Sequence, residues 1–125
     1  MAVQVVVVDD TEHVRRMLVE MLTIDNFDVV GQAANGSEAI NVTEETNPDV
    51  VIMDYNMPGM DGLASSRRIL DLRPDQPIIL YTAYLDEALK EEARRAGITV
   101  CLHKTEGLGR LERHIADLAR VIGRV

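Results

Sequence analysis

The sequence predicts a doubly wound α/β fold, in which a five-stranded parallel sheet carries helices on both faces. Five short apolar runs alternate along the chain with five segments whose apolar residues recur every three or four positions. Parallel neighbouring strands need long crossovers, which the intervening helices supply. A length of 125 residues fits one domain, which we expect to span residues 1–125.

The first strand is expected at Val5–Val8, a β-branched run of the kind buried on both faces of a parallel sheet. It ends at Asp9 and Asp10, and Thr11 is the expected N-cap of the first helix. The apolar residues of that helix follow at helical spacing: Val14, Met17, Leu18, Met21 and Leu22.

The same alternation continues to the end of the chain, with Gly, Asn and Pro at the joints. Gly97 is placed to end the fourth helix. The remaining strands are expected at 28–33, 50–53, 78–81 and 98–102, and the remaining helices at about 37–47, 63–72, 85–96 and 108–122.

Composition and charge exclude several classes of protein. With 21 acidic and 13 basic residues, the net charge of −8 would repel nucleic acid and anionic membranes. No apolar run approaches the ~18 residues of a membrane-spanning helix, and the apolar start of the chain lacks the basic residues of a secretory signal. The single cysteine, Cys101, forms no internal disulfide, which fits a reducing compartment, so we expect a cytoplasmic protein.

Polar residues follow four of the expected strands. Asp9 and Asp10 end the first, Asp54 the third, Thr82 the fourth and Lys104 the fifth. All these strand ends meet at one edge of a parallel sheet. If the strand order is 2-1-3-4-5, the three acids line the crevice between strands one and three, where ligands bind in such folds.

These residues favour phosphoryl chemistry with a divalent cation. Clustered carboxylates raise each other's pKa unless a cation neutralises them, and an all-oxygen site suits Mg²⁺. Lys104 can neutralise phosphoryl oxygens and Thr82 can donate a hydrogen bond to one. Asp54 is then the candidate nucleophile.

The sequence resembles a receiver domain of the two-component response regulators over nearly its whole length. The matching motifs are VVVVDD at 5–10, MDYNMPGMDG at 53–62, YTA at 81–83 and Lys104. The resemblance implies a flavodoxin-like (βα)5 fold. It also implies a switch that catalyses its own phosphorylation and dephosphorylation, with no turnover of an external substrate.

The resemblance assigns roles to individual residues. It implies that Asp54 becomes a 4-aspartylphosphate, accepting its phosphoryl group from a histidine kinase or a phosphotransfer protein. It implies that Mg²⁺ is held by Asp10, Asp54 and the backbone carbonyl of Asn56, with Asp9 assisting.

In this family the phosphoryl group would be contacted by Lys104, Thr82 and the backbone N–H of Ala83. The surface from the fourth strand to the fifth helix would then shift and change partner affinity. The resemblance also implies that Asn56 and Tyr84 occupy positions that, in this family, flank the attacking water and tune the lifetime of the acylphosphate.

The implied partners include an output domain, such as a helix-turn-helix DNA-binding domain that would serve in transcription regulation, and a phosphorylation-dependent homodimer. The last helix is expected to end around Ile122, leaving Arg124 and Val125. We therefore expect either a stand-alone receiver or a piece of a longer regulator.

Two positions depart from the family pattern. Cys101 stands where an aromatic residue commonly swings inward with the threonine, so we hypothesise that switching depends on Thr82 and the loop before the fourth helix. Thr105 stands where many relatives have a proline after a cis bond. We expect a trans Lys104–Thr105 bond, because a non-proline cis bond costs about 2.5 to 4 kcal/mol.

Other classes fit less well. An aspartyl phosphohydrolase would carry its nucleophile after the first strand and need a cap domain. A flavin mononucleotide carrier would need a phosphate loop where Asp9 and Asp10 stand. His103, on the last strand, receives no role from the sequence.

Overall fold

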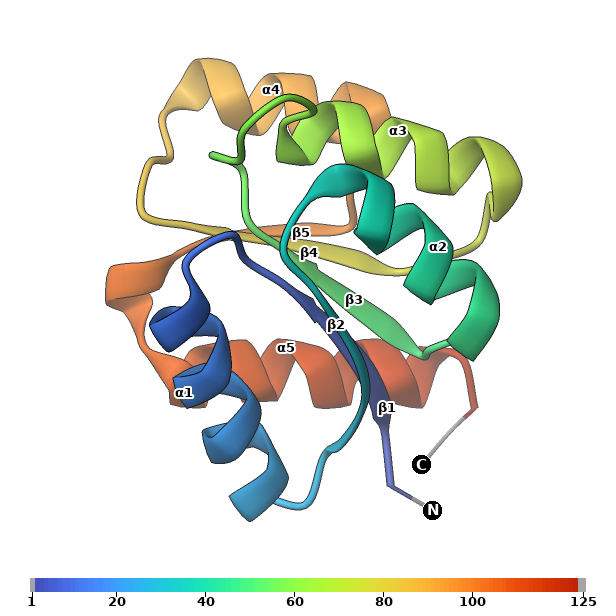
Figure 1. Cartoon of the computed structure of the whole chain (residues 1–125), viewed down its shortest axis with the longest axis vertical. Coiled ribbons are helices and arrows are strands. Elements are labelled where there is room, and N and C mark those ends of the chain that lie inside the picture. Colours follow the sequence, from blue (N-terminus) through green and yellow to red (C-terminus); the bar gives the residue numbers. More distant parts are fainter. Residues whose placement is uncertain (1, 124–125) are drawn as a thin grey trace.

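The five apolar runs form one parallel sheet, which lies between two layers of helices (Figure 1). The structure, a computed structural model, describes residues 2–123; Arg124 and Val125 lie outside this range. The strand order is β2-β1-β3-β4-β5, as expected. The strands are β1 (Gln4–Val8), β2 (Asp28–Ala33), β3 (Val50–Met53), β4 (Ile78–Thr82) and β5 (Val100–His103).

The helices divide between the two faces of the sheet. Two of them, the first and the last, cover one face, and the other three cover the opposite face (Figure 1). None of the helices in the described part of the chain combines the length and apolar character needed to cross a membrane. The helices are α1 (Glu12–Ile24), α2 (Gly36–Thr46), α3 (Gly62–Leu72), α4 (Glu87–Ala96) and α5 (Leu108–Val121), with a short 3-10 helix, η1, at Lys104–Glu106.

Alternating side chains of the central strands build a separate core on each face. In β1, Val5 and Val7 pack in the core beneath α1 and α5, whereas Val6 and Val8 pack beneath α2, α3 and α4. Because each of these valines is at most 2% exposed, the strand is apolar throughout, as a strand buried on both faces must be.

Two helix or strand boundaries lie two residues from the sequence expectation. Helix α4 begins at Glu87 rather than near Leu85, because the carboxylate of Asp86 accepts a hydrogen bond from the N–H of Leu89 and caps the helix there. Strand β5 begins two residues later than expected, because the N–H of Ile98 still bonds to Ala93 at the end of α4. The helix η1 is not predicted at all.

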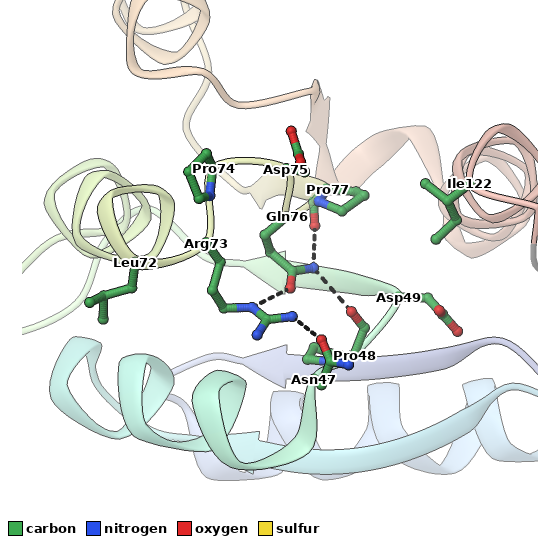
Figure 2. Close-up of a pocket in the computed structure, with 10 residues that line it drawn as sticks. All are labelled: Asn47, Pro48, Asp49, Leu72, Arg73, Pro74, Asp75, Gln76, Pro77 and Ile122. Carbon is green, nitrogen blue, oxygen red and sulfur yellow. Dashed lines mark hydrogen bonds between the residues drawn. The ribbon is translucent and has the colours of Figure 1, made fainter.

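The amino-terminal edge of the sheet is closed by a network centred on Gln76, which is 5% exposed. Its amide nitrogen donates to the carbonyl oxygens of Pro48 (3.3 Å) and Pro77 (3.1 Å), and its oxygen accepts from Arg73 (3.0 Å), as Figure 2 shows. Arg73 also donates to Asn47. The network lines a pocket of about 400 Å³ and joins the segments that lead into β3 and β4.

Candidate functional site

Three carboxylates converge at the carboxyl edge of the sheet, as the sequence predicts. Asp9 and Asp10 follow β1, Asp54 follows β3, and one oxygen from each lies within 4.8 Å of the others. Asp9 and Asp54 are 2% and 7% exposed, whereas Asp10 faces solvent. The cluster therefore combines two desolvated acids with one that is open to water.

Lys104 supplies the positive charge of this cluster. It follows β5, and its Nζ lies 2.8 Å from Oδ2 of Asp9 and 3.6 Å from Oδ2 of Asp54. Burial alone would lower the pKa of Lys104, but the hydrogen bond to Asp9 and the charges of both acids outweigh it and raise that pKa. The lysine therefore stays protonated between the two buried carboxylates.

The surroundings of Asp54 shift the pKa of its carboxyl group in opposite directions. Burial is the largest and raises its pKa, the charge of Lys104 lowers it, and Asp9 raises it. Its Oδ1 accepts a hydrogen bond from the N–H of Tyr55 at 2.9 Å. Oδ2 faces Lys104, so the two oxygens of this carboxylate have different partners.

The backbone of the loop after β3 leaves no room for a side chain at position 62. A Cβ added to Gly62 would lie 2.1 Å from the carbonyl oxygen of Asp54, and the N–H of Gly62 donates to the carbonyl of Tyr55 at 2.8 Å. This close backbone approach requires glycine at position 62.

The other expected site residues lie outside the cluster of carboxylates and lysine. Thr82 ends β4 with no solvent exposure, and its Oγ1 accepts a hydrogen bond from the N–H of Tyr84 at 3.3 Å. Asn56 and Ala83 are exposed in the loops after β3 and β4. The structure thus brings Asp9, Asp10, Asp54 and Lys104 into one cluster and places Thr82, Asn56 and Ala83 on its neighbouring loops and strand.

The two departures from the family pattern lie on or beside β5. Cys101 is half-buried and packs against the core beneath α4, and burial raises the pKa of its thiol. The described residues contain no cis peptide bond, so the bond before Thr105 is trans, as expected. His103, to which the sequence assigns no role, accepts a hydrogen bond from the N–H of Thr105 and caps η1.

Comparison with known proteins identifies this arrangement. Residues 5–116 match the family model described as the response regulator receiver domain. The chain belongs to that family. The match spans β1 to the middle of α5, so every residue of the carboxylate and lysine cluster of this receiver lies inside it.

Relatives carry the domain alone or within longer proteins. The receiver is 37% identical over 97 residues to the chemotaxis protein CheY of Thermotoga maritima, covering 78% of this chain and 81% of CheY. It is 33% identical over 132 residues to a protein-glutamate methylesterase/protein-glutamine glutaminase of Photobacterium profundum, covering 96% of this chain. This chain spans only a third of the length of that second relative.

A solved structure confirms the flavodoxin-like (βα)5 fold. The signal receiver domain of the response regulator NarL from Mycobacterium tuberculosis superposes with a TM-score of 0.88 at 29% identity. The match covers 95% of this chain and 97% of that one.

One residue beside the cluster, Arg15, is not predicted from the sequence. Nη1 of Arg15, on α1, donates to the backbone carbonyl of Asp9 at 2.8 Å, and its Nε donates to Gln32 of β2 at 3.3 Å. Thr11 holds the N-cap position but makes no side-chain capping bond; its N–H donates to Asp9 at 2.9 Å. Arg15 lies on a helix that also carries Arg16, and the sequence offers no signal that separates the two.

Proposed function

We propose that residues 1–125 form one receiver domain whose Asp54 accepts a phosphoryl group in a Mg²⁺-dependent reaction. The observation that carries the proposal is the placement of Nζ of Lys104 3.6 Å from Oδ2 of Asp54, within a cluster of three acids. That oxygen is the nucleophile, since the other oxygen is held by the N–H of Tyr55. Lys104 then neutralises the charge on the transferred group.

The donor set supports Mg²⁺. Oxygens around an octahedral Mg²⁺ lie about 3 to 4 Å apart, so small side-chain rotations would bring carboxylates separated by up to 4.8 Å into range. We propose Asp10, Asp54 and the backbone carbonyl of Asn56 as ligands, with Asp9 assisting. The ion would supply charge neutralisation between the carboxylates and the phosphoryl oxygens.

In the proposed transfer, Oδ2 of Asp54 bonds to phosphorus while the P–N bond of a donor phosphohistidine breaks, and the imidazole leaves with the electron pair. Thr82 and the N–H of Ala83 would bind the transferred oxygens. Hydrolysis of the acylphosphate then restores the carboxylate and releases inorganic phosphate. The receiver acts as a switch and turns over no external substrate.

The proposed phosphodonor is a histidine kinase or phosphotransfer protein in the cytoplasm. An apolar groove of about 280 Å³ between α1 and α5 is lined by Met17, Met21, Leu108 and Lys104. Met17 is 60% exposed, which leaves this groove open to a partner. The response would pass through the surface from β4 to α5, with Thr82 as a switch residue, to an output domain, including one for transcription regulation, or to a second copy.

The test is intact mass after incubation with Mg²⁺ and acetyl phosphate, for the wild type and Asp54→Asn. One phosphoryl adduct is expected in the wild type and none in the variant or without metal. An adduct that persists in Asp54→Asn would place the acceptor elsewhere, and the absence of any adduct in the wild type would refute the proposal.

A further inference from the structure

The backbone that carries Lys104 is held by a small hydrogen-bonded unit built around His103. Nδ1 of His103 accepts a hydrogen bond from the N–H of Thr105 at 3.1 Å and lies 2.7 Å from Oγ1 of the same threonine. The N–H of His103 donates to Oε2 of Glu106 at 2.9 Å. The two bonds form a reciprocal capping box that encloses Lys104 on both sides.

Other contacts tie this unit to the rest of the receiver. Oε1 of Glu106 pairs with Nε of Arg110 at 2.9 Å, which connects the box to α5. The carbonyl oxygen of Lys104 accepts a hydrogen bond from the N–H of Gly107 at 3.3 Å. The backbone of Lys104 is therefore fixed from the strand before it and from the helix after it.

The restraint on the Lys104 backbone matters for the site because the long side chain of this lysine extends from β5 to the acids. Its Nζ spans from β5 to Asp9 at 2.8 Å and to Asp54 at 3.6 Å. A lysine side chain has several rotatable bonds and about 2 kcal/mol of rotamer entropy, so the direction in which it leaves the backbone decides where its charge lies. A turn that loosens at Thr105 would redirect that charge.

The chemistry of the cap specifies which side chains can provide it. Thr105 offers an N–H to the imidazole, and Nδ1 accepts it as an unprotonated ring nitrogen, so the ring proton is on Nε2. An asparagine amide oxygen occupies nearly the same place as Nδ1 and is a good N-cap acceptor. A leucine has similar bulk but offers no acceptor.

We propose that His103 is a positioning residue for phosphoryl transfer, which acts by holding the turn that aims Lys104 at Asp54. The inference rests on the proposed function of Asp54 as phosphoacceptor. His103 itself touches neither the phosphoryl group nor the carboxylates in this mechanism.

The test compares phosphorylation rates with acetyl phosphate and Mg²⁺ in the wild type, His103→Leu and His103→Asn. We expect His103→Leu to be about tenfold slower, since small displacements of a reacting group cost one to two orders of magnitude in rate. His103→Asn should recover to within about threefold of the wild type. Equal rates in the wild type and His103→Leu, or equal losses in both variants, would overturn the inference.

Mg²⁺ affinity, measured by calorimetry, separates positioning from general damage. We expect His103→Leu to bind Mg²⁺ at least as tightly as the wild type, because the carboxylates keep their places and a redirected Lys104 competes less with the ion for their charge. Weaker binding would show that the whole site is distorted and would contradict the inference. If His103→Leu fails to fold, Glu106→Ala removes the other half of the box from an exposed position and should slow phosphorylation without weakening Mg²⁺ binding.

Different results would refute the phosphoacceptor role of Asp54 and the positioning role of His103. A wild-type receiver that forms no adduct refutes the proposed function, and with it this inference. A wild type that is phosphorylated while His103→Leu reacts equally fast refutes the role of His103 alone.

Discussion

Gly62 and Asp54 approach so closely that the position of the glycine cannot hold a side chain: a Cβ there would lie 2.1 Å from the carbonyl oxygen of Asp54. The contact is backbone to backbone, so no side-chain rotation can relieve it. The loop after β3 and the start of α3 are thereby held against the proposed phosphoacceptor.

We therefore expect Gly62→Ala to destabilise the receiver by about 1 to 3 kcal/mol and to slow its phosphorylation, because the added methyl displaces the loop. Gly109→Ala is the matched control. A Cβ at Gly109, in α5, meets open space, and replacing a helical glycine stabilises by about 0.5 to 1 kcal/mol. Urea unfolding measures both, and equal effects would contradict the close-approach argument.

Lys104→Met should lower the free energy of unfolding by about 1 to 3 kcal/mol at neutral pH, because the buried carboxylate of Asp9 loses its 2.8 Å partner. The charge of Lys104 lowers the pKa of Asp54, so its loss raises that pKa further above the unfolded value. A carboxyl with a raised pKa stabilises the fold as pH falls through that pKa. The deficit should thus shrink on acidification, whereas Lys90→Met, an exposed control, should show little deficit at any pH.

Glu112 is a second group that makes the free energy of unfolding depend on pH. Burial, and secondarily the neighbouring Asp25, raise the pKa of Glu112 from 4.5 to about 7. The folded protein then holds this proton more tightly than the unfolded chain, so stability declines as pH rises from 4.5 to about 7 and levels off above.

Glu112→Gln should remove that decline and stabilise the receiver at pH 8 by no more than about 1 kcal/mol, since solvent screens a carboxyl that is far from fully buried. Urea midpoints at pH 5 and pH 8 are the measurement. Glu92→Gln, on the exposed side of α4, provides the control and should keep the wild-type slope.

Tyr84 is expected to affect the lifetime of the acylphosphate more than its formation. The ring is half-exposed in the loop after β4, and its hydroxyl donates to Asp86 at 2.7 Å. Tyr84→Ala should speed dephosphorylation severalfold by admitting water, with little change in phosphorylation rate, and Tyr84→Phe should lie near the wild type. Equal effects on both rates would exclude a water-gating role, and the same comparison applies to Asn56.

The amide resonance of Cys101 reports whether β5 takes part in the switch of this receiver. The thiol replaces an aromatic side chain, so we expect activation with beryllofluoride and Mg²⁺ to shift the amide resonances of Thr82 and residues 83–89 and to leave that of Cys101 nearly unchanged. A large shift at Cys101 with little at 83–89 would show that β5 carries the switch instead.

Most of the fold and the charged cluster follow from the sequence, because buried strands and their terminal acids leave a strong pattern. Boundaries are less certain where signals compete: Leu85 fits the apolar stripe of α4, but the cap at Asp86 decides where the helix begins. Ile98 resembles a strand residue, yet it still bonds to the end of α4. Such choices depend on hydrogen bonds that periodicity does not show.

The parts of the site that escaped prediction are those that act through the backbone. Gly62 is required by a neighbouring carbonyl, and Arg15 donates to the carbonyl of Asp9. His103 serves as a cap, a role usually taken by Ser, Thr, Asp or Asn, so its residue type gives no warning. Side-chain chemistry can be read from a sequence more readily than support of the main chain.

The buried amide of Gln76 has a mechanical consequence for the receiver. By joining the segments that enter β3 and β4, it restrains the end of the sheet remote from Asp54. When one end of a sheet is restrained, a displacement driven at the opposite, free end is largest at that free end. The amplitude of any phosphorylation-driven motion should therefore grow along β3 and β4 toward Asp54 and Thr82, and amide hydrogen exchange should be slowest near Pro77 and faster toward that free end.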